Sequence, residues 1–132
     1  MPKLYEVTIP YVLKNHNAGQ QRAWQIAAAE RKRCEKQLRD AGHIRKPMKR
    51  PISLEIVRNL GPKQRFWDND SILRGTAKQL IDSLVACGWF NDDSPAYLQQ
   101  VVGRQQILLD DKEKRLPPST TIVMWSTFAT FN

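Results

Sequence analysis

The sequence contains few of the residue patterns that mark common catalytic centres. Its 132 residues include only two cysteines and two histidines, and no zinc-ligand spacing connects them. No nucleophile elbow is present, and residues 74–78 do not form a phosphate-binding P-loop. These absences argue against a zinc enzyme, a hydrolase of the nucleophile-elbow type and a P-loop nucleotidase.

Long hydrophobic runs are also absent. No apolar stretch approaches the length that spans a membrane, and residues 1–9 lack the hydrophobic region of a secretory signal peptide. We therefore expect a cytoplasmic protein with no membrane partner. Cys34 and Cys87 lie in apolar, helix-like contexts, so we expect two buried free thiols and no disulfide. The length fits a single domain over residues 1–132.

The charge of the chain is distributed unevenly. The net charge is +8, but residues 14–65 hold 14 Lys and Arg against 4 Asp and Glu, whereas residues 66–113 hold 8 acids against 4 bases. A basic region beside an acidic one suits a polyanion that is bound by one surface and a cation that is held by another. Uniform basicity would have indicated only contacts to a phosphate backbone.

Hydrophobic periodicity predicts four strands and two helices. The strands are expected over residues 4–9, 52–56, 97–107 and 120–128, and the helices over residues 20–41 and from Asp70 or Ser71 to Cys87. Gly42 and Gly88 are the predicted helix stops. The order strand, helix, strand, helix, strand, strand predicts an α/β or α+β fold, with a small four-stranded mixed sheet and two main helices packed on it.

Acidic residues gather around the second predicted helix. Because like charges repel at close range, such a group needs a neutralising partner, and hard Mg²⁺ is commonly held by a few carboxylate oxygens with water and substrate phosphate. The plainer interpretations are a helix cap for Asp-Asn-Asp and a solvated i,i+4 pair on the helix. The residues concerned are Asp68, Asp70, Lys78, Asp82, Asp92 and Asp93.

Two pairs of adjacent acids differ in their surroundings. Asp110 and Asp111 are followed by three bases within residues 112–115, so a charged surface loop accounts for them. Asp92 and Asp93 have no nearby base in the sequence and follow an aromatic turn. We therefore expect another group to neutralise Asp92 and Asp93.

Basic residues before the acidic region are candidates for phosphate contacts, although each alone is typical of a solvated surface. Trp67, next to Asp68, is a candidate for stacking on an unpaired base, with core packing as the alternative. The basic candidates are Lys14, Arg22, Arg31, Lys32, Arg45, Lys46, Lys49, Arg50, Lys63 and Arg65, and Arg74, inside the acidic region, is a further candidate.

Taken together, D-x-D, a helix with K-x-x-x-D-x-L, and a glycine followed by D-D resemble the RusA family of Holliday junction resolvases, small endonucleases often encoded by prophages. The likeness is strongest over residues 68–94 and extends in order over the whole chain. Ser71 stands where the family usually has asparagine, and Asp70 and Lys78 lie farther apart than in shorter members. The residues that keep the family's mutual spacing are Lys78, Asp82, Leu84, Gly88, Asp92 and Asp93.

The resemblance implies a homodimer that binds four-way DNA junctions in recombination and repair, and nicks opposing strands symmetrically with Mg²⁺, or with Mn²⁺ in its place. Asp70, Lys78 and Asp93 are the implied catalytic residues, with Arg74 as the alternative to Lys78. The implied metal-binding carboxylates are Asp68, Asp70, Asp92 and Asp93.

Other functions and one structural question stay open. A junction- or duplex-DNA-binding protein on the same fold that does not cleave is the alternative, and a generic RNA-binding domain is a third possibility that leaves the acids unexplained. The apolar fourth strand, with Trp125 and Phe128, is a candidate dimer interface.

Overall fold

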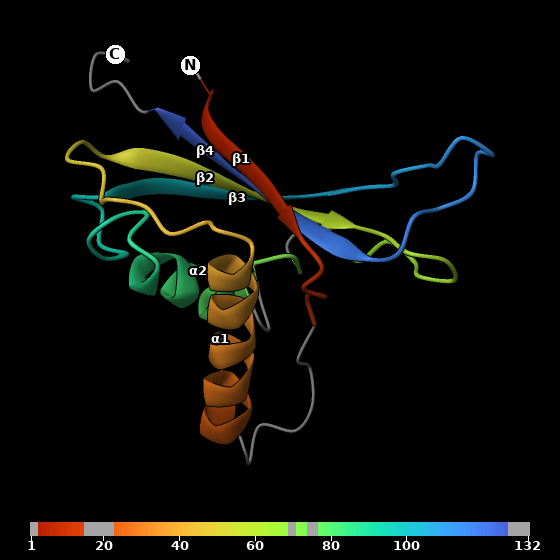
Figure 1. Ribbon diagram of the computed structural model, residues 1–132, viewed down its shortest axis with the longest axis horizontal. Coiled ribbons are helices and arrows are strands. Elements are labelled where there is room, and N and C mark those ends of the chain that lie inside the picture. The colour runs from red at the N-terminus through yellow and green to blue at the C-terminus, as the bar shows by residue number, and fades with distance from the viewer. Residues whose placement is uncertain (1–2, 15–22, 69–70, 74–76, 127–132) are drawn as a thin grey trace.

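A computed structural model of the protein describes residues 3–14, 23–68, 71–73 and 77–126. These residues form a four-stranded mixed sheet and two helices, which confirms the predicted α+β fold (Figure 1). The elements are β1 (Lys3–Ile9), α1 (Ala23–Asp40), β2 (Ile52–Asn59), α2 (Ala77–Ala86), β3 (Leu98–Gln106) and β4 (Ser119–Ser126).

The strand order in the sheet is β1-β4-β2-β3. Strand β4 is antiparallel to both of its neighbours, whereas β2 and β3 are parallel and are connected through α2. Both helices lie on one face of the sheet, and no described helix covers the other, which we call the open face (Figure 1). None of the described helices is long and apolar enough to cross a membrane.

The core lies between the sheet and the two helices. Ile52, Leu54 and Ile56 alternate along β2 and are almost fully buried, as are Leu80 and Leu84 four residues apart on α2. These are the periods of two and of about four residues that place one face of each element in the core. Burial of several large aliphatic side chains, at about 1.5–3 kcal/mol each, is the main force that holds the helices on the sheet.

Both cysteines are free and buried, as predicted. Burial raises the pKa of the Cys34 thiol to about 12 and also raises that of Cys87. Their low exposure and high pKa make them apolar core residues.

Each helix ends at a glycine in the left-handed conformation, at the predicted stops. Gly42 has a φ of 79° and Gly88 has a φ of 84°. After α1, the His43 N–H donates to the Leu38 carbonyl, and after α2 the Trp89 N–H donates to the Leu84 carbonyl. This is the Schellman pattern, which favours glycine because that residue has no Cβ.

The second helix begins later than predicted. Residues 71–73 form a turn, in which the Ser71 N–H donates to the Asp68 carbonyl at 2.9 Å. Ile72 is buried against β3, where a Cβ on Gly103 would lie 2.6 Å from the Ile72 Cβ. The predicted start at Asp70 or Ser71 is therefore wrong, because tertiary packing of Ile72 overrides the local capping signal.

Candidate functional site

A short strap of chain, residues 65–68, carries the first described acid of the predicted site. The Gln105 side chain accepts a hydrogen bond from the Trp67 N–H at 2.8 Å and donates to the Trp67 carbonyl at 2.9 Å. Beneath the strap, the Arg58 guanidinium lies 3.7 Å from the centre of the Trp67 ring and donates to the Arg65 carbonyl at 2.8 Å. These contacts, which we call the strap clamp, fix the backbone directly before Asp68.

The Trp67 side chain packs against the rest of the protein. Its side chain is half-buried, packs on the hydrophobic core and has Arg58 over its ring. Arg58 is itself only 5% exposed, and burial lowers the pKa of its guanidinium. Of the two interpretations of Trp67, core packing is the one that these contacts support.

The second part of the site is a hollow between α1, α2 and the turn after α2. Its volume is about 360 Å³. One end of α2 contributes Lys78, whose Nζ lies 3.9 Å from Asp93 Oδ2. The lining residues are Arg31, Glu35, Asp82, Val85, Ala86, Asp92 and Asp93.

The hollow places two bases near Asp92 and Asp93. They are Lys78, the ion-pair partner of Asp93, and Arg31 in the wall. The Lys78–Asp93 pair is at the outer limit of ion-pair distance, and both side chains are more than half exposed, so it is weak.

Asp92 also shapes the turn that carries the acid pair. Its Oδ1 accepts the Ser94 N–H at 2.7 Å. Hydrogen bonds from the side chain and the backbone of Ser94 lower the pKa of this carboxyl below its ordinary value. Asp92 is therefore an ionised carboxylate at neutral pH.

A basic connector, residues 43–51, lies against the same turn. The Arg45 N–H donates to the Cys87 carbonyl at 2.8 Å, and the indole N–H of Trp89 donates to the His43 carbonyl at 3.0 Å. Arg45 is half-buried, with its guanidinium 3.9 Å from the centre of the Tyr5 ring. The connector thus has a fixed position next to the segment that leads to Asp92.

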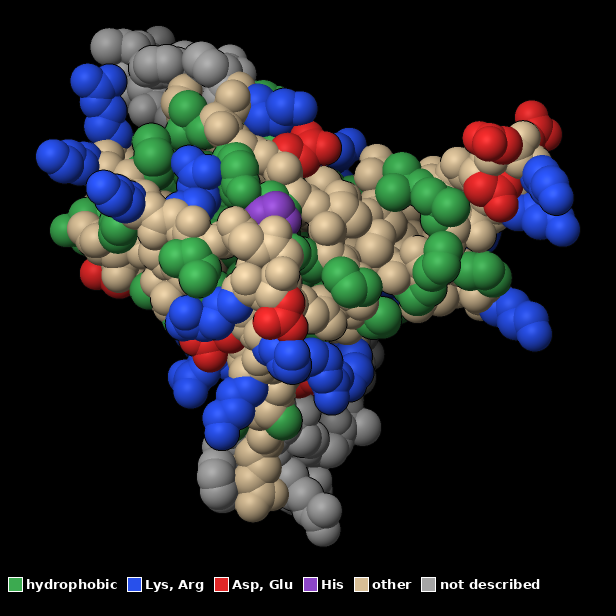
Figure 2. All heavy atoms as spheres, in the orientation of Figure 1, with side chains coloured by type: hydrophobic (Ala, Val, Ile, Leu, Met, Phe, Trp, Pro, Cys, Tyr) green, Lys and Arg blue, Asp and Glu red, His purple; other side chains and the backbone are tan. Residues whose placement is uncertain are grey.

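The connector presents three exposed bases: Lys46, Lys49 and Arg50. Figure 2 shows Lys and Arg side chains around the connector and along α1, with Asp and Glu side chains between them. Arg31, Lys32, Lys63 and Arg65 are exposed as well.

Lys14 has a different environment from the other basic candidates. Its Nζ lies 2.5 Å from Oε1 of Glu30, which is only 3% exposed. Burial acts to raise the pKa of Glu30, but hydrogen bonds from Lys14 and Tyr11, with the charges of Lys14 and Arg33, more than offset this and lower it. The half-exposed Lys14 side chain therefore stabilises the buried carboxylate of Glu30.

Three predicted residues lie outside the described part of the chain: Arg22, Asp70 and Arg74. Within the described residues, no group of three or more His, Cys, Asp or Glu side chains is placed to hold a metal ion. The structure brings together Asp92, Asp93 and Lys78, and it does not place Asp70 relative to them.

No protein-family model matches this chain, and no curated protein matches it.

Two residues at the site were not anticipated from the sequence. Glu35 lines the acidic hollow from α1. Its position on a helical face could have been predicted, but not the packing of that face beside Asp92. Phe66, in the strap, is 58% exposed although it is aromatic, whereas the predicted candidate for base stacking was its neighbour Trp67.

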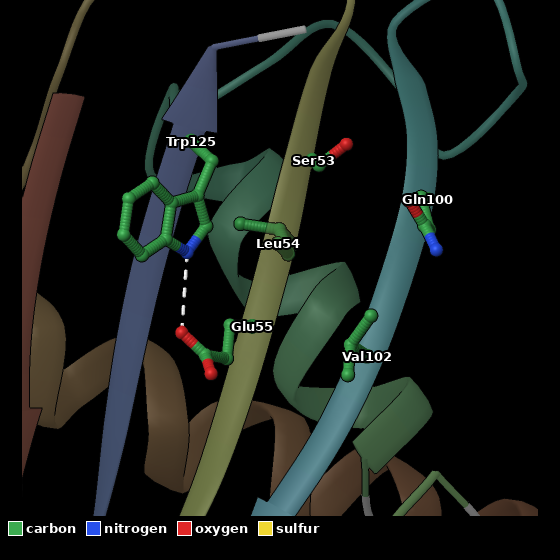
Figure 3. Close-up of a pocket in the computed structure, with 6 residues that line it drawn as sticks. All are labelled: Ser53, Leu54, Glu55, Gln100, Val102 and Trp125. Carbon is green, nitrogen blue, oxygen red and sulfur yellow. Dashed lines mark hydrogen bonds between the residues drawn. The ribbon is translucent and has the colours of Figure 1, made fainter. Parts of the chain in front are cut away.

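The open face of the sheet carries a second hollow, of about 290 Å³ (Figure 3). The indole N–H of Trp125 donates to Glu55 Oε1 at 3.1 Å, and Glu55 also pairs with Arg104. Strand β4 is an inner strand, so Trp125 lies on a sheet face and not at an edge. Phe128, the other residue of the candidate dimer interface, lies outside the described residues.

Proposed function

We propose that this chain is a Mg²⁺-dependent, structure-selective DNA endonuclease that resolves four-way junctions by paired symmetric nicks. The observation that carries the proposal is the juxtaposition of the acidic hollow, the loosely paired Lys78 and the basic connector held against the same turn. The acids at this turn have oxygen donors suited to a divalent cation, and the connector that carries the exposed bases is hydrogen-bonded to the same turn.

The acidic residues fit Mg²⁺ by the chemistry of their donor atoms. Mg²⁺ prefers oxygen ligands and is commonly held by one or two carboxylates, with water and substrate phosphate in the other positions. On our proposal, Asp68, Asp70, Asp92 and Asp93 would hold it. A bound Mg²⁺ would supply Lewis-acid stabilisation of the phosphate and an activated water.

Lys78 is the proposed phosphate-stabilising residue. Its side chain is 68% exposed, and only Asp93, at 3.9 Å, is its ion-pair partner among the described residues. A lysine in this state can contact a phosphate oxygen without breaking a strong internal interaction, and it would stabilise the charge that develops during hydrolysis. Arg74 is the alternative for this role.

The basic connector is the proposed grip on DNA. Lys46, Lys49 and Arg50 are exposed on a segment whose backbone is bonded to the turn before Asp92. Phosphate contacts from such bases give binding that weakens steeply with salt. Paired symmetric nicks require two equivalent sites, so we propose a homodimer, acting on DNA in the cytoplasm.

Cleavage of a synthetic four-way junction tests the proposal, with the matching linear duplex as the comparison and with Mg²⁺ or EDTA present. The wild-type protein should make paired nicks in the junction only with Mg²⁺. Asp93→Asn should reduce the rate by at least about 100-fold, because it removes a proposed metal ligand and the partner of Lys78. Asp111→Asn is the matched control, because it also removes one exposed acid but lies in the loop between β3 and β4.

Three other results of the cleavage assay would each contradict part of the proposal. Equal loss in both variants would indicate a general charge effect and contradict the assigned site. Junction binding without cutting by the wild-type protein would support the non-cleaving alternative on the same fold. Equal cutting of junction and duplex would remove the junction selectivity.

A further inference from the structure

We propose that Phe66 stacks on an unstacked base of the bound DNA, next to the phosphate that is cut. This inference deepens the proposed function and rests on it for the identity of the ligand. It starts from one observation, which is that Phe66 is 58% exposed although it lies in a segment held firmly on both sides. It is the most exposed large hydrophobic residue of the described chain.

The strap clamp defines the direction in which Phe66 points. Trp67 uses both its N–H and its carbonyl to bond the Gln105 side chain, as an extended residue does within a sheet. Side chains alternate along an extended segment, so Phe66 and Asp68 leave the strap on the side opposite Trp67. Trp67 turns to the core, and Phe66 and Asp68 are both exposed.

This alternation places an aromatic ring beside a proposed metal-binding acid. Residues two apart in an extended chain are separated by about 7 Å, so Phe66 is a near neighbour of Asp68. Nucleic-acid sites combine cationic contacts to phosphate with exposed rings on which bases stack.

The clamp also makes Phe66 a rigid platform. The Arg65 carbonyl accepts from Arg58, and both backbone groups of Trp67 are bonded to Gln105, so the backbone on each side of Phe66 is fixed. An aromatic ring on a fixed backbone loses little conformational entropy on binding. A base in continuous duplex is already stacked, whereas a base at a branch point can be unstacked. Phe66 would therefore favour branched DNA over linear duplex.

The test measures binding and stacking in EDTA, so that it does not depend on cleavage. A four-way junction with 2-aminopurine at the branch point is titrated with wild-type protein, Phe66→Ala, Phe66→Leu and Phe66→Tyr. Phe66→Tyr, which keeps the ring, should change the fluorescence as the wild type does. Phe66→Ala and Phe66→Leu should lose most of the fluorescence change and bind the junction about tenfold more weakly, with a smaller effect on linear duplex.

Leu109→Ala is the matched control, since Leu109 is 54% exposed and lies far along the chain in the loop after β3. It should bind as the wild type does, and circular dichroism should show all variants folded. Wild-type fluorescence changes in Phe66→Ala would overturn the inference, as would a wild-type protein that binds no junction. A ring-dependent signal in a protein that never cuts would sink the nuclease proposal and leave Phe66 as a stacking residue. Normal cutting by the wild type, with no effect of Phe66→Ala on fluorescence or binding, would leave the nuclease proposal standing and overturn the stacking role of Phe66.

Discussion

Replacing Gly88 by alanine tests whether the turn after α2 and the basic connector form one packed unit. The chain offers a matched control in Gly42, because both glycines end a helix in the same hydrogen-bonded pattern with similar positive φ. An alanine Cβ at position 42 would have no atom within 4 Å, whereas at position 88 it would lie 2.0 Å from the Arg45 carbonyl oxygen. The two substitutions share the backbone strain and differ in the clash.

The structure gives the expected magnitudes. A non-glycine residue in the left-handed conformation costs about 1 kcal/mol, so Gly42→Ala should lose about that much stability. At Gly88, the Cβ and the Arg45 carbonyl must separate by more than about 1 Å to reach ordinary contact. That movement breaks the bond from the Arg45 N–H to the Cys87 carbonyl and strains the one from Trp89 to His43. With about 1 kcal/mol for each hydrogen bond, Gly88→Ala should lose about 3 kcal/mol or more.

Urea denaturation of the wild type and both variants measures the difference. The midpoint should fall for both, with Gly88→Ala at least about 2 kcal/mol less stable than Gly42→Ala, and the slope should not change. In thermal unfolding, Gly42→Ala should lower the midpoint by about 4 °C and Gly88→Ala by about 12 °C. Equal losses of stability in Gly42→Ala and Gly88→Ala would show that the connector can move away from the turn at no cost. That result would contradict the proposal that the two form one packed unit.

Two further predictions concern buried titratable groups. Cys34, with a pKa of about 12, should not react with a thiol reagent at pH 8 until the protein is unfolded in urea. Because its folded pKa is above that of an unfolded thiol, its contribution to stability is complete below about pH 8.5 and should decline as the pH rises towards 12, which urea titrations at increasing pH will measure. Glu30→Gln should lower stability by about 1–2 kcal/mol at pH 7, since the ionised carboxylate accepts bonds from Tyr11 and Lys14. The folded pKa of Glu30 is lowered, so the wild type loses this advantage as the pH falls through and below about 4, and urea midpoints of the two proteins should converge there.

The fold was predictable where local pattern and tertiary packing agree. The alternation in β1 and β2 and the stop glycines after each helix identified the elements, because side-chain period and left-handed backbone are local properties. The start of α2 was not predictable from capping residues alone. Ile72 packs onto β3 at Gly103, and a contact between residues 31 positions apart leaves no local pattern.

Of the candidate site, the sequence indicated the proximity of Lys78 and Asp93, and the roles of the predicted acids stay predictions. Spacing on α2 and in the following turn singled out Lys78 and Asp93, which the structure brings within 3.9 Å. Glu35 enters the same hollow only through the packing of α1 on α2. The sequence alone does not show which of Phe66 and Trp67 faces outward. The hydrogen bonds between Gln105 and the Trp67 backbone determine this.

The pairing of β1 with β4 has a consequence for how the protein is made. These strands lie near opposite ends of the described chain, and Lys3 is registered with Trp125. At about 5–20 residues per second, a ribosome needs on the order of ten seconds to deliver β4 after β1 has emerged. During that interval β1 has no neighbouring strand to pair with, although Val7 and Ile9 are destined for the core. Among the described strands, β1 thus waits longest for its partner, and protection by a chaperone would matter most for this segment.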